Sequence, residues 1–539
     1  MFLNILADIL PLYRSRRYDL GAFGRWPHQL YHSSRAVGPI LNIHDESEEC
    51  YNDRIYATAP YWGGQVNVPG VMLLNTKGNL VWHSTGYGTA GIQSHLGEDY
   101  IVSLAKTRIN SCYEEVYQIL PGNGWQLDAH ELTLSPLGTA LLVINGVVPV
   151  NQTAFQAPHE VEFILDAGFQ EIDIKTGDVL FEWRASNHYS SEEYYYFRPG
   201  DGRSEKTAPD LFHINRIEKD DLGNYLISCR MMSSVAYVDG RTGAVIWKLG
   251  GKANMLKDLS GGTATNFNGQ HHPRFHDNGR IVSFFDNGNC PGRPATGPTR
   301  GLAAILDTEK TTHEYISPNS VLTDSSGSMQ ILETGNVVLG FGPNANWAEY
   351  ASNGSLCNFH MGPETFFNSG EIRSYRISKS PWVGRQKMPD IAGDKGRVYV
   401  SWNGATEVSM WALNGVDTEQ VGGESVLLGK FPKDCFGIGI PLPEHPTSRY
   451  LFVDALDQVS SGQPLQYSGL PRQDRFYTRV FKASKMEKKE NQAHVSNGDG
   501  VLLSGQLEQS CLIVESRRVN CSLLAREDGP ILRLRSLPS

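Results

Sequence analysis

The chain has 539 residues, a formal net charge of −10 and a pI near 5.9. This acidic balance, without a long Lys/Arg run or an interleaved aromatic-basic patch, argues against nucleic-acid binding. No stretch approaches the roughly 18 uninterrupted apolar residues of a membrane span. The 55 glycines and 28 prolines, with turn dipeptides at short intervals, favour an all-β protein of many short strands.

The N-terminal stretch is apolar but is interrupted by Asn4, Asp8 and Pro11, and its arginines follow the apolar run. Because it makes a poor signal peptide, we expect an intracellular protein, with the secretory pathway as the alternative. Residues 1–60 are expected to form an irregular strap. The eight cysteines lack CxxC spacing, which excludes a recognisable zinc module and leaves disulfides undecided.

Two short patterns recur along the chain. One is an Asn/Asp-containing turn with Thr-Gly, followed by a strand that often ends on Trp, as in residues 171–183 and 237–249. The other is a hairpin in which alternating apolar residues flank a tight polar turn. This hairpin occurs six times, at residues 91–106, 130–146, 213–230, 271–288, 328–342 and 390–404.

The six hairpins have the spacing of propeller blades and predict a six-bladed β-propeller over residues 61–484. A polar, tyrosine-rich insertion at residues 186–209 precedes the third hairpin, and insertions of this kind often cover a site. Residues 485–539 have no blade pattern and are expected to form a linker and a C-terminal extension.

A cluster of cationic and polar side chains is expected at one mouth of the propeller. Blades around an axis bring equivalent positions of their inner hairpins into a ring. In three hairpins that position is histidine: His130, His213 and His271. Pairing about the turn of the third hairpin places Arg230 opposite His213, and Asn215 shares a face with that histidine.

Further residues are candidates at the same mouth. The turn of the fourth hairpin places Asp286 opposite His271, where a carboxylate could orient the imidazole. His272 should point to the opposite face, and we interpret it as structural. Trp347 and Trp402 are candidate aromatic walls for a substrate, with ordinary blade packing as the alternative.

This cluster allows three interpretations. It could be a structural ring of hydrogen-bonded histidines, a three-histidine metal site, or an oxyanion-binding or catalytic site. The adjoining arginine repels a cation, so we expect no metal at this cluster. We also expect the protein to use no cofactor. The third interpretation accounts best for a guanidinium beside imidazoles.

Five segments carry a family resemblance. DLFHINRI, ISCR, TGAVIWKLGG and NGQHHPRF with FDNG resemble the arylsulfotransferase-like propellers, particularly their fungal branch, over residues 18–454. Bacterial members move a sulfuryl group between phenols through a sulfohistidine, without a nucleotide donor. The resemblance implies that His271 is the nucleophile. It implies supporting roles for His130, His213, Asn215 and Arg230, whereas Met231 stands where many relatives have histidine.

Fungal members similar to this chain include hetero-Diels-Alderases of tropolonic sesquiterpene (meroterpenoid) biosynthesis. In such an enzyme Arg230, His213 and His130 would bind the oxygens of a quinone methide, and His271 with Asp286 would supply a proton or a hydrogen bond. We therefore expect a secondary-metabolism enzyme that acts on phenolic or tropolone and terpene small molecules, with cycloaddition as the main hypothesis. The alternatives are sulfuryl transfer and a non-catalytic interaction platform, and the oligomeric state is left open.

Overall fold

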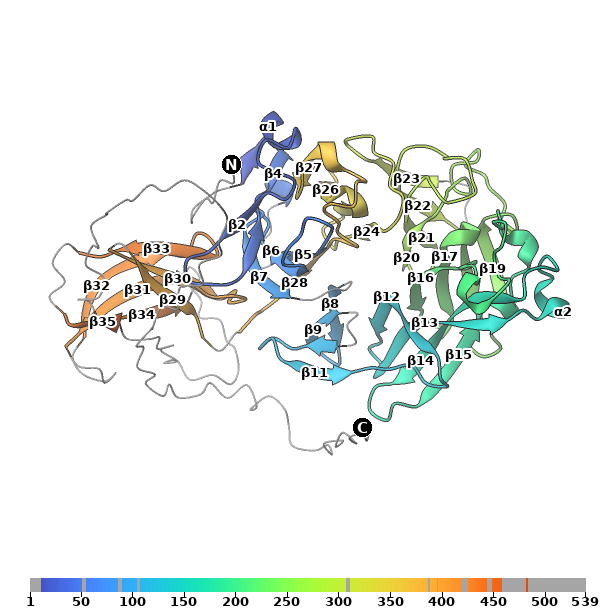
Figure 1. Ribbon diagram of the computed structural model, residues 1–539, viewed down its shortest axis with the longest axis horizontal. Coiled ribbons are helices and arrows are strands. Elements are labelled where there is room, and N and C mark those ends of the chain that lie inside the picture. Colours follow the sequence, from blue (N-terminus) through green and yellow to red (C-terminus); the bar gives the residue numbers. More distant parts are fainter. Residues whose placement is uncertain are drawn as a thin grey trace, which may run out of the picture.

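The computed structural model (Figure 1) describes residues 11–50, 55–85, 90–103, 107–306, 311–385, 388–394, 396–417, 425–443, 448–457 and 481–482. Within these residues the α-helices are two single turns, α1 (Arg16–Asp19) and α2 (Gln152–Phe155), and the remaining regular structure is strand and short 3-10 turns. The all-β prediction is confirmed. In the described part of the chain, no helix has the length and apolar character needed to cross a membrane. The predicted extension at 485–539 lies outside the described residues.

Five antiparallel sheets follow one another along the chain, each starting with its inner strand. The first two are β8 (Ala90–His95), β9 (Glu98–Ser103), β10 (Thr107–Ile109) and β11 (Glu115–Gln118), then β12 (Gln126–Leu134), β13 (Thr139–Pro149), β14 (Phe163–Asp173) and β15 (Val179–Arg184). The next two are β16 (Ile214–Lys219), β17 (Tyr225–Cys229), β18 (Ser234–Val238) and β19 (Val245–Gly250), then β20 (His271–His276), β21 (Ile281–Asp286), β22 (Arg300–Ile305) and β23 (Thr311–Ile316).

The fifth sheet also takes in part of the N-terminal segment. Its strands are β24 (Ser328–Ile331), β25 (Val337–Gly340), β26 (Asn346–Tyr350) and β27 (Leu356–His360), extended at the outer edge by β4 (Asn42–Asp45) and β1 (Leu12–Tyr13). The strands β2 (His28–Leu30) and β3 (Val37–Pro39) form a separate small hairpin. The N-terminal segment therefore runs along the outside of this sheet.

A sixth sheet joins distant parts of the chain. Its strands are β28 (Ser378–Pro381), β5 (Ile55–Tyr61), β6 (Gly70–Leu74) and β7 (Leu80–Thr85). The inner strands of the six sheets contact one another in the order β8, β12, β16, β20, β24, β28 and back to β8. The sheets are therefore arranged around a common centre in a propeller-like fold, as Figure 1 shows.

The hairpin at 390–404 is not an inner hairpin of this ring, so that prediction is wrong. Its strands β29 (Asp390–Asp394) and β30 (Arg397–Ser401) pair with β33 (Gly437–Pro441). A second small sheet contains β31 (Val408–Val416), β32 (Val426–Pro432), β34 (Tyr450–Asp457) and β35 (Phe481–Lys482). The two sheets share a hydrophobic cluster and lie to one side of the ring, in orange in Figure 1. The inner strand of the sixth sheet is β28, and its partner β5 lies more than 300 residues earlier in the chain. Because no short turn connects the two strands, a local sequence pattern could not predict this pairing.

A disulfide joins Cys50, after β4, to Cys357 in β27, across 307 residues of sequence. Disulfides are typical of oxidising compartments, which favours the secretory alternative. Replacing both cysteines with alanine is expected to lower the free energy of unfolding by about 2–4 kcal/mol, because the long loop is no longer closed in the unfolded chain. Chemical denaturation measures this change. Cys435→Ser, at a cysteine that is not part of this disulfide, is the control, and equal unfolding midpoints for wild type with and without reductant would contradict the expectation.

Candidate functional site

The three predicted histidines come together at three neighbouring inner strands. His130 lies in β12, His213 directly precedes β16, and His271 begins β20. The rings of His130 and His213 meet edge to face with centroids 4.4 Å apart. The ring of Tyr375 lies 5.7 Å from that of His130 and 6.4 Å from that of His271. The predicted convergence is therefore observed, with a tyrosine beside His130 and His271.

Irregular backbone positions each of these histidines. The pairing register shifts between Leu127 and Leu132 in β12, beside Asn215 in β16, and after His271 in β20. Such bulges bend a strand and redirect its side chains, and they are frequent next to active sites. His213 adds a left-handed backbone, with φ of +50°. A non-glycine residue held in this conformation costs on the order of 1 kcal/mol or more, which the surrounding structure must supply.

Two of the histidines are each paired with a carboxylate. His130 Nδ1 lies 2.5 Å from Asp128, and His213 Nδ1 lies 2.5 Å from Asp210. Asp128 is held in turn by the Asn145 amide at 2.8 Å. A carboxylate at Nδ1 fixes the imidazole orientation and leaves Nε2 to face a ligand. Burial lowers the pKa of His213, and the nearby Asp210 carboxylate opposes this effect.

His271 is fully buried and held in one orientation. Its Nδ1 lies 2.7 Å from the Asn287 side-chain oxygen and 3.0 Å from the Gly269 carbonyl, so Nδ1 carries the proton. Nε2 accepts the Ser326 backbone N–H at 3.2 Å. Burial and the neighbouring Arg230 charge hold the pKa of His271 well below its usual range. At neutral pH this side chain is therefore an uncharged imidazole with its lone pair on Nε2.

Asp286 does not orient His271, and that prediction is wrong. Phe285 lies opposite His271, while Asp286 forms an ion pair with Arg300 at 2.9 Å. In most pairs of this hairpin the two residue numbers add up to 557, and this register would place Asp286 opposite His271. The bulge after His271 shifts the register by one residue, so Asp286 is not its partner. Asn287, the next residue, makes the contact that was expected from the carboxylate.

Arg230 lies opposite His213, as predicted, because its backbone N–H donates to the His213 carbonyl at 3.2 Å. Its side chain donates to the Asp324 carbonyl at 2.6 Å and to the Met231 sulfur at 3.2 Å. The buried Arg230 Nε has no hydrogen-bond partner among the described residues. A desolvated guanidinium N–H without a partner is a donor ready for an anionic oxygen.

Two of the remaining predictions fail, and one residue was missed. Trp347 stacks on Phe359 inside a core cluster, and Trp402 packs in the hydrophobic cluster of the separate two-sheet unit. The structure therefore brings neither tryptophan to the histidines. Asn215 is buried and donates to the Gln270 carbonyl at 2.8 Å, while its own side-chain oxygen has no partner among the described residues. The aromatic residue at the site is Tyr375, whose pKa burial raises to about 12.

A buried ion network lies directly behind the histidines. Glu131 is 2.5 Å from Arg216 and 2.5 Å from Arg376, and Arg376 also donates to the Asn215 carbonyl. Each of these charged residues comes directly after a residue of the cluster in the sequence: Glu131 follows His130, Arg216 follows Asn215 and Arg376 follows Tyr375. Beyond them lies a cavity of about 290 Å³ lined by all six inner strands, where the predicted structural His272 bonds the Met329 carbonyl. Glu131 and Arg376 line this cavity, whereas the three clustered histidines do not.

The comparisons with known proteins bear on the family and the fold. Residues 105–361 match the model of the Arylsulfotransferase (ASST) family, a segment that contains His130, His213, Arg230 and His271. This match fits an arylsulfotransferase-like enzyme. No curated protein matches the chain in sequence.

Similar solved structures are distant. A Bacteroides caccae protein of unknown function shares 14% identity over 60% of this chain and 98% of its own, with a TM-score of 0.34. A catalytically inactive virginiamycin B lyase from Staphylococcus aureus with quinupristin is 9% identical in sequence. The match covers 68% of this chain and 96% of the lyase, with a TM-score of 0.30. Hydrazine synthase of Kuenenia stuttgartiensis is 8% identical in sequence. The match covers 68% of this chain and 95% of the synthase chain, with a TM-score of 0.28. None is close enough to bear on function.

Proposed function

We propose that the protein transfers a sulfuryl group from an aryl sulfate to a phenol through a sulfohistidine on His271. The observation that carries this proposal is the His271 imidazole, which is uncharged, buried and oriented by Asn287, beside a guanidinium and two carboxylate-backed histidines. The family match over residues 105–361 supports the same chemistry. We also infer that the six sheets form a closed six-bladed propeller with this site at its axial mouth, an inference supported by the cyclic contacts of the inner strands.

In the first step the lone pair of His271 Nε2 attacks the sulfur, and the bond between sulfur and the aryl oxygen breaks. The substrate must first displace the Ser326 N–H from Nε2. The unpartnered Arg230 Nε donates to a sulfuryl oxygen as negative charge shifts during transfer. The departing phenolate takes a proton from His213 or His130.

In the second step an acceptor phenol attacks the same sulfur, and the N–S bond breaks. The histidine that gave up its proton now accepts one from the phenol, so each cycle ends with the starting protonation states. His271 again becomes a neutral imidazole. The asparagine at Nδ1 suits this role better than a carboxylate would, because it fixes the tautomer without adding a charge.

The test is incubation of the full chain with 4-nitrophenyl sulfate and a phenol acceptor. The expected result is nitrophenol release that continues only while acceptor is present, because without an acceptor the enzyme stops as the sulfohistidine. Absence of nitrophenol release from any aryl sulfate, by protein with an intact fold, would overturn the proposal.

One observation favours cycloaddition as a second candidate function. The Met231 thioether lies 3.8 Å from the Cys290 sulfur and gives the cluster an apolar side beside Arg230. Arg230, His213 and His130 would then bind the oxygens of a quinone methide while the apolar side receives a terpene olefin. Formation of a cycloadduct from these two partners without sulfate tests this function. Failure of both reactions would favour a non-catalytic interaction platform.

Asp210→Asn is expected to lower kcat at neutral pH by up to about 10²-fold. Asp210 opposes the effect of burial on His213, so its loss lowers the pKa of His213 further, and the imidazolium that protonates the phenolate persists only at lower pH. The alkaline limb of the pH–kcat profile should therefore move to lower pH. Asp221→Asn, at an exposed position of the same hairpin, is the control. An unshifted profile would remove His213 from the acid–base role.

A further inference from the structure

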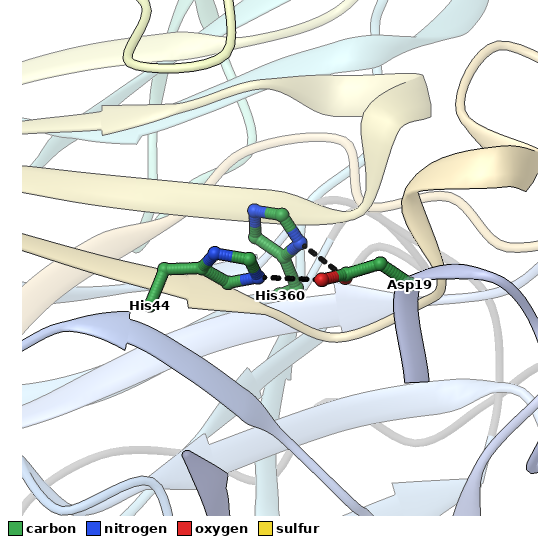
Figure 2. Close-up of side chains that lie close together, drawn as sticks. All are labelled: Asp19, His44 and His360. Atoms are coloured by element: carbon green, nitrogen blue, oxygen red, sulfur yellow. Dashed lines mark hydrogen bonds and ion pairs between the residues drawn. The ribbon is translucent and has the colours of Figure 1, made fainter. Parts of the chain in front are cut away.

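Asp19, His44 and His360 form a second cluster, far from the histidine mouth in sequence. They come from α1, β4 and β27, and Figure 2 shows both imidazoles turned toward the Asp19 carboxylate. One Asp19 oxygen lies 2.9 Å from His44 Nε2, and the other lies 3.1 Å from His360 Nδ1. The two rings stack with centroids 4.0 Å apart. Three donor atoms from separate segments therefore point at one small region.

The cluster has a buried side and an open side. His360 is fully buried, whereas the side chain of His44 is 26% exposed. Asp19 and His44 line an open cavity of about 660 Å³, whose wall also includes Asp45 and Glu364. A ligand on these atoms would be held from behind and reached from solvent.

We propose that Asp19, His44 and His360 bind one divalent transition-metal ion, with zinc as the reference ion. Two imidazole nitrogens and one carboxylate oxygen are a donor set that zinc uses, with a fourth position left for water or a ligand. The candidate donor atoms all lie within 4.8 Å of one another. Donors around tetrahedral zinc lie about 3.3 Å apart, so small side-chain movements suffice.

The surroundings supply the outer contacts that such sites use. His360 Nε2 lies 3.0 Å from the Asn319 amide nitrogen. When Nδ1 binds the ion, Nε2 carries the proton, so the Asn319 side chain must turn its amide oxygen toward Nε2 to hold the ring. The Asn42 amide lies 3.0 Å from both Asp19 and His44 Nε2 and must release His44 when the metal binds. It keeps its bonds to the Ser15 backbone at 2.9 and 3.2 Å.

The charged side chains around the proposed site are of both signs, and on balance they favour the binding of a cation. Glu364 and Asp45 lie close enough to act electrostatically on His44. Of the two arginines on the cavity wall, Arg14 pairs with Asp45 at 3.5 Å and donates to the His44 carbonyl at 2.7 Å. Its charge is thus partly neutralised next to the site.

The proposed ion would join the same two parts of the chain as the Cys50–Cys357 disulfide. Both links connect the N-terminal segment to β27. A metal that binds the folded protein and not the unfolded chain raises the unfolding temperature. The site therefore stabilises the attachment of the N-terminal segment, independently of the reaction at His271.

The test uses the tag-free full chain, stripped with a chelator and titrated with zinc chloride by calorimetry. We expect one equivalent to bind and the unfolding temperature to rise, and cobalt to give a tetrahedral absorption spectrum. Asp19→Asn and His44→Gln should each weaken binding by more than about 100-fold, the upper end of the cost of losing an outer-shell partner. Circular dichroism verifies that both variants are folded.

His313→Gln, at an exposed histidine of β23, is the matched control and should bind zinc as wild type does. Absence of one-equivalent binding to wild type would overturn the proposal and leave the cluster as a hydrogen-bonded contact. Binding that survives in both cluster variants, or that is lost in His213→Gln instead, would also overturn it, because the ion would then sit at the histidine mouth.

Discussion

Replacing His271 with alanine is expected to lower kcat/KM for sulfuryl transfer by more than about 10³-fold. Alanine leaves no atom to bond the sulfur, whereas Arg230 and the two carboxylate-backed histidines stay in place. Initial rates of nitrophenol release, with and without a phenol acceptor, measure the loss. His271 is buried, so the variant also creates a cavity, and its unfolding midpoint must be measured beside its rate.

His276→Gln is the matched control for this experiment. His276 lies on the same strand, β20, but it bonds Ser283 and is not part of the cluster. We expect it to keep the wild-type rate. A His271→Ala protein that retains most of the wild-type rate would assign the nucleophile to another residue and would leave the Asn287 contact without a catalytic purpose.

Replacing Glu131 with glutamine is expected to destabilise the folded protein by about 3–5 kcal/mol. Glu131 bridges Arg216 and Arg376 in a network with almost no solvent exposure. The amide keeps the shape of the side chain but removes the charge that compensates two buried guanidinium groups. Chemical denaturation measures the loss, and Glu333→Gln, at an exposed position in the turn between β24 and β25, is the control.

The same carboxylate predicts an acid-dependent loss of stability. Burial alone would raise the pKa of Glu131, but the charges of Arg216 and Arg376 outweigh it and lower the pKa to about 2. A lowered pKa in the folded state contributes stability above the unfolded value, and that stability is lost as the pH falls toward the folded value. Between about pH 4.5 and 2 the wild type should therefore lose more stability than Glu131→Gln. Parallel loss in the two proteins would show that Glu131 is not charged in the folded state.

The histidine cluster could be located from the sequence because its residues recur at one place in successive hairpins. His130, His213 and His271 precede similar turns, and an alternating strand pattern fixes the face of each. In most pairs of the third hairpin the two residue numbers add up to 444, a register that would not place Arg230 opposite His213. The bulge at Asn215 shifts the register by one residue, and Arg230 therefore does lie opposite His213, as predicted. For His271 the same kind of bulge moved Asp286 out of the site.

The remaining errors have a common physical origin in long-range pairing. The strand β28 has only four residues and finds its partner β5 far away in the chain, so no turn signal marks it. Tyr375 and Arg376, which directly precede that strand region, were missed for the same reason. The hairpin at 390–404 has a clear local pattern, yet it forms a separate core around Trp402. Local patterns predicted hairpins well but did not reveal which sheet each one joins.

The most direct test of the account is mass spectrometry of the full chain after brief incubation with 4-nitrophenyl sulfate and no acceptor. We expect a protein heavier by one SO₃ group, which is carried on the peptide that contains His271 and is discharged when a phenol is added. The Asn287→Ala protein should form this adduct more slowly, because its imidazole is no longer held with the proton on Nδ1 and the lone pair on Nε2. Sulfuryl transfer that proceeds with no adduct on His271, or an adduct on another residue, would contradict it.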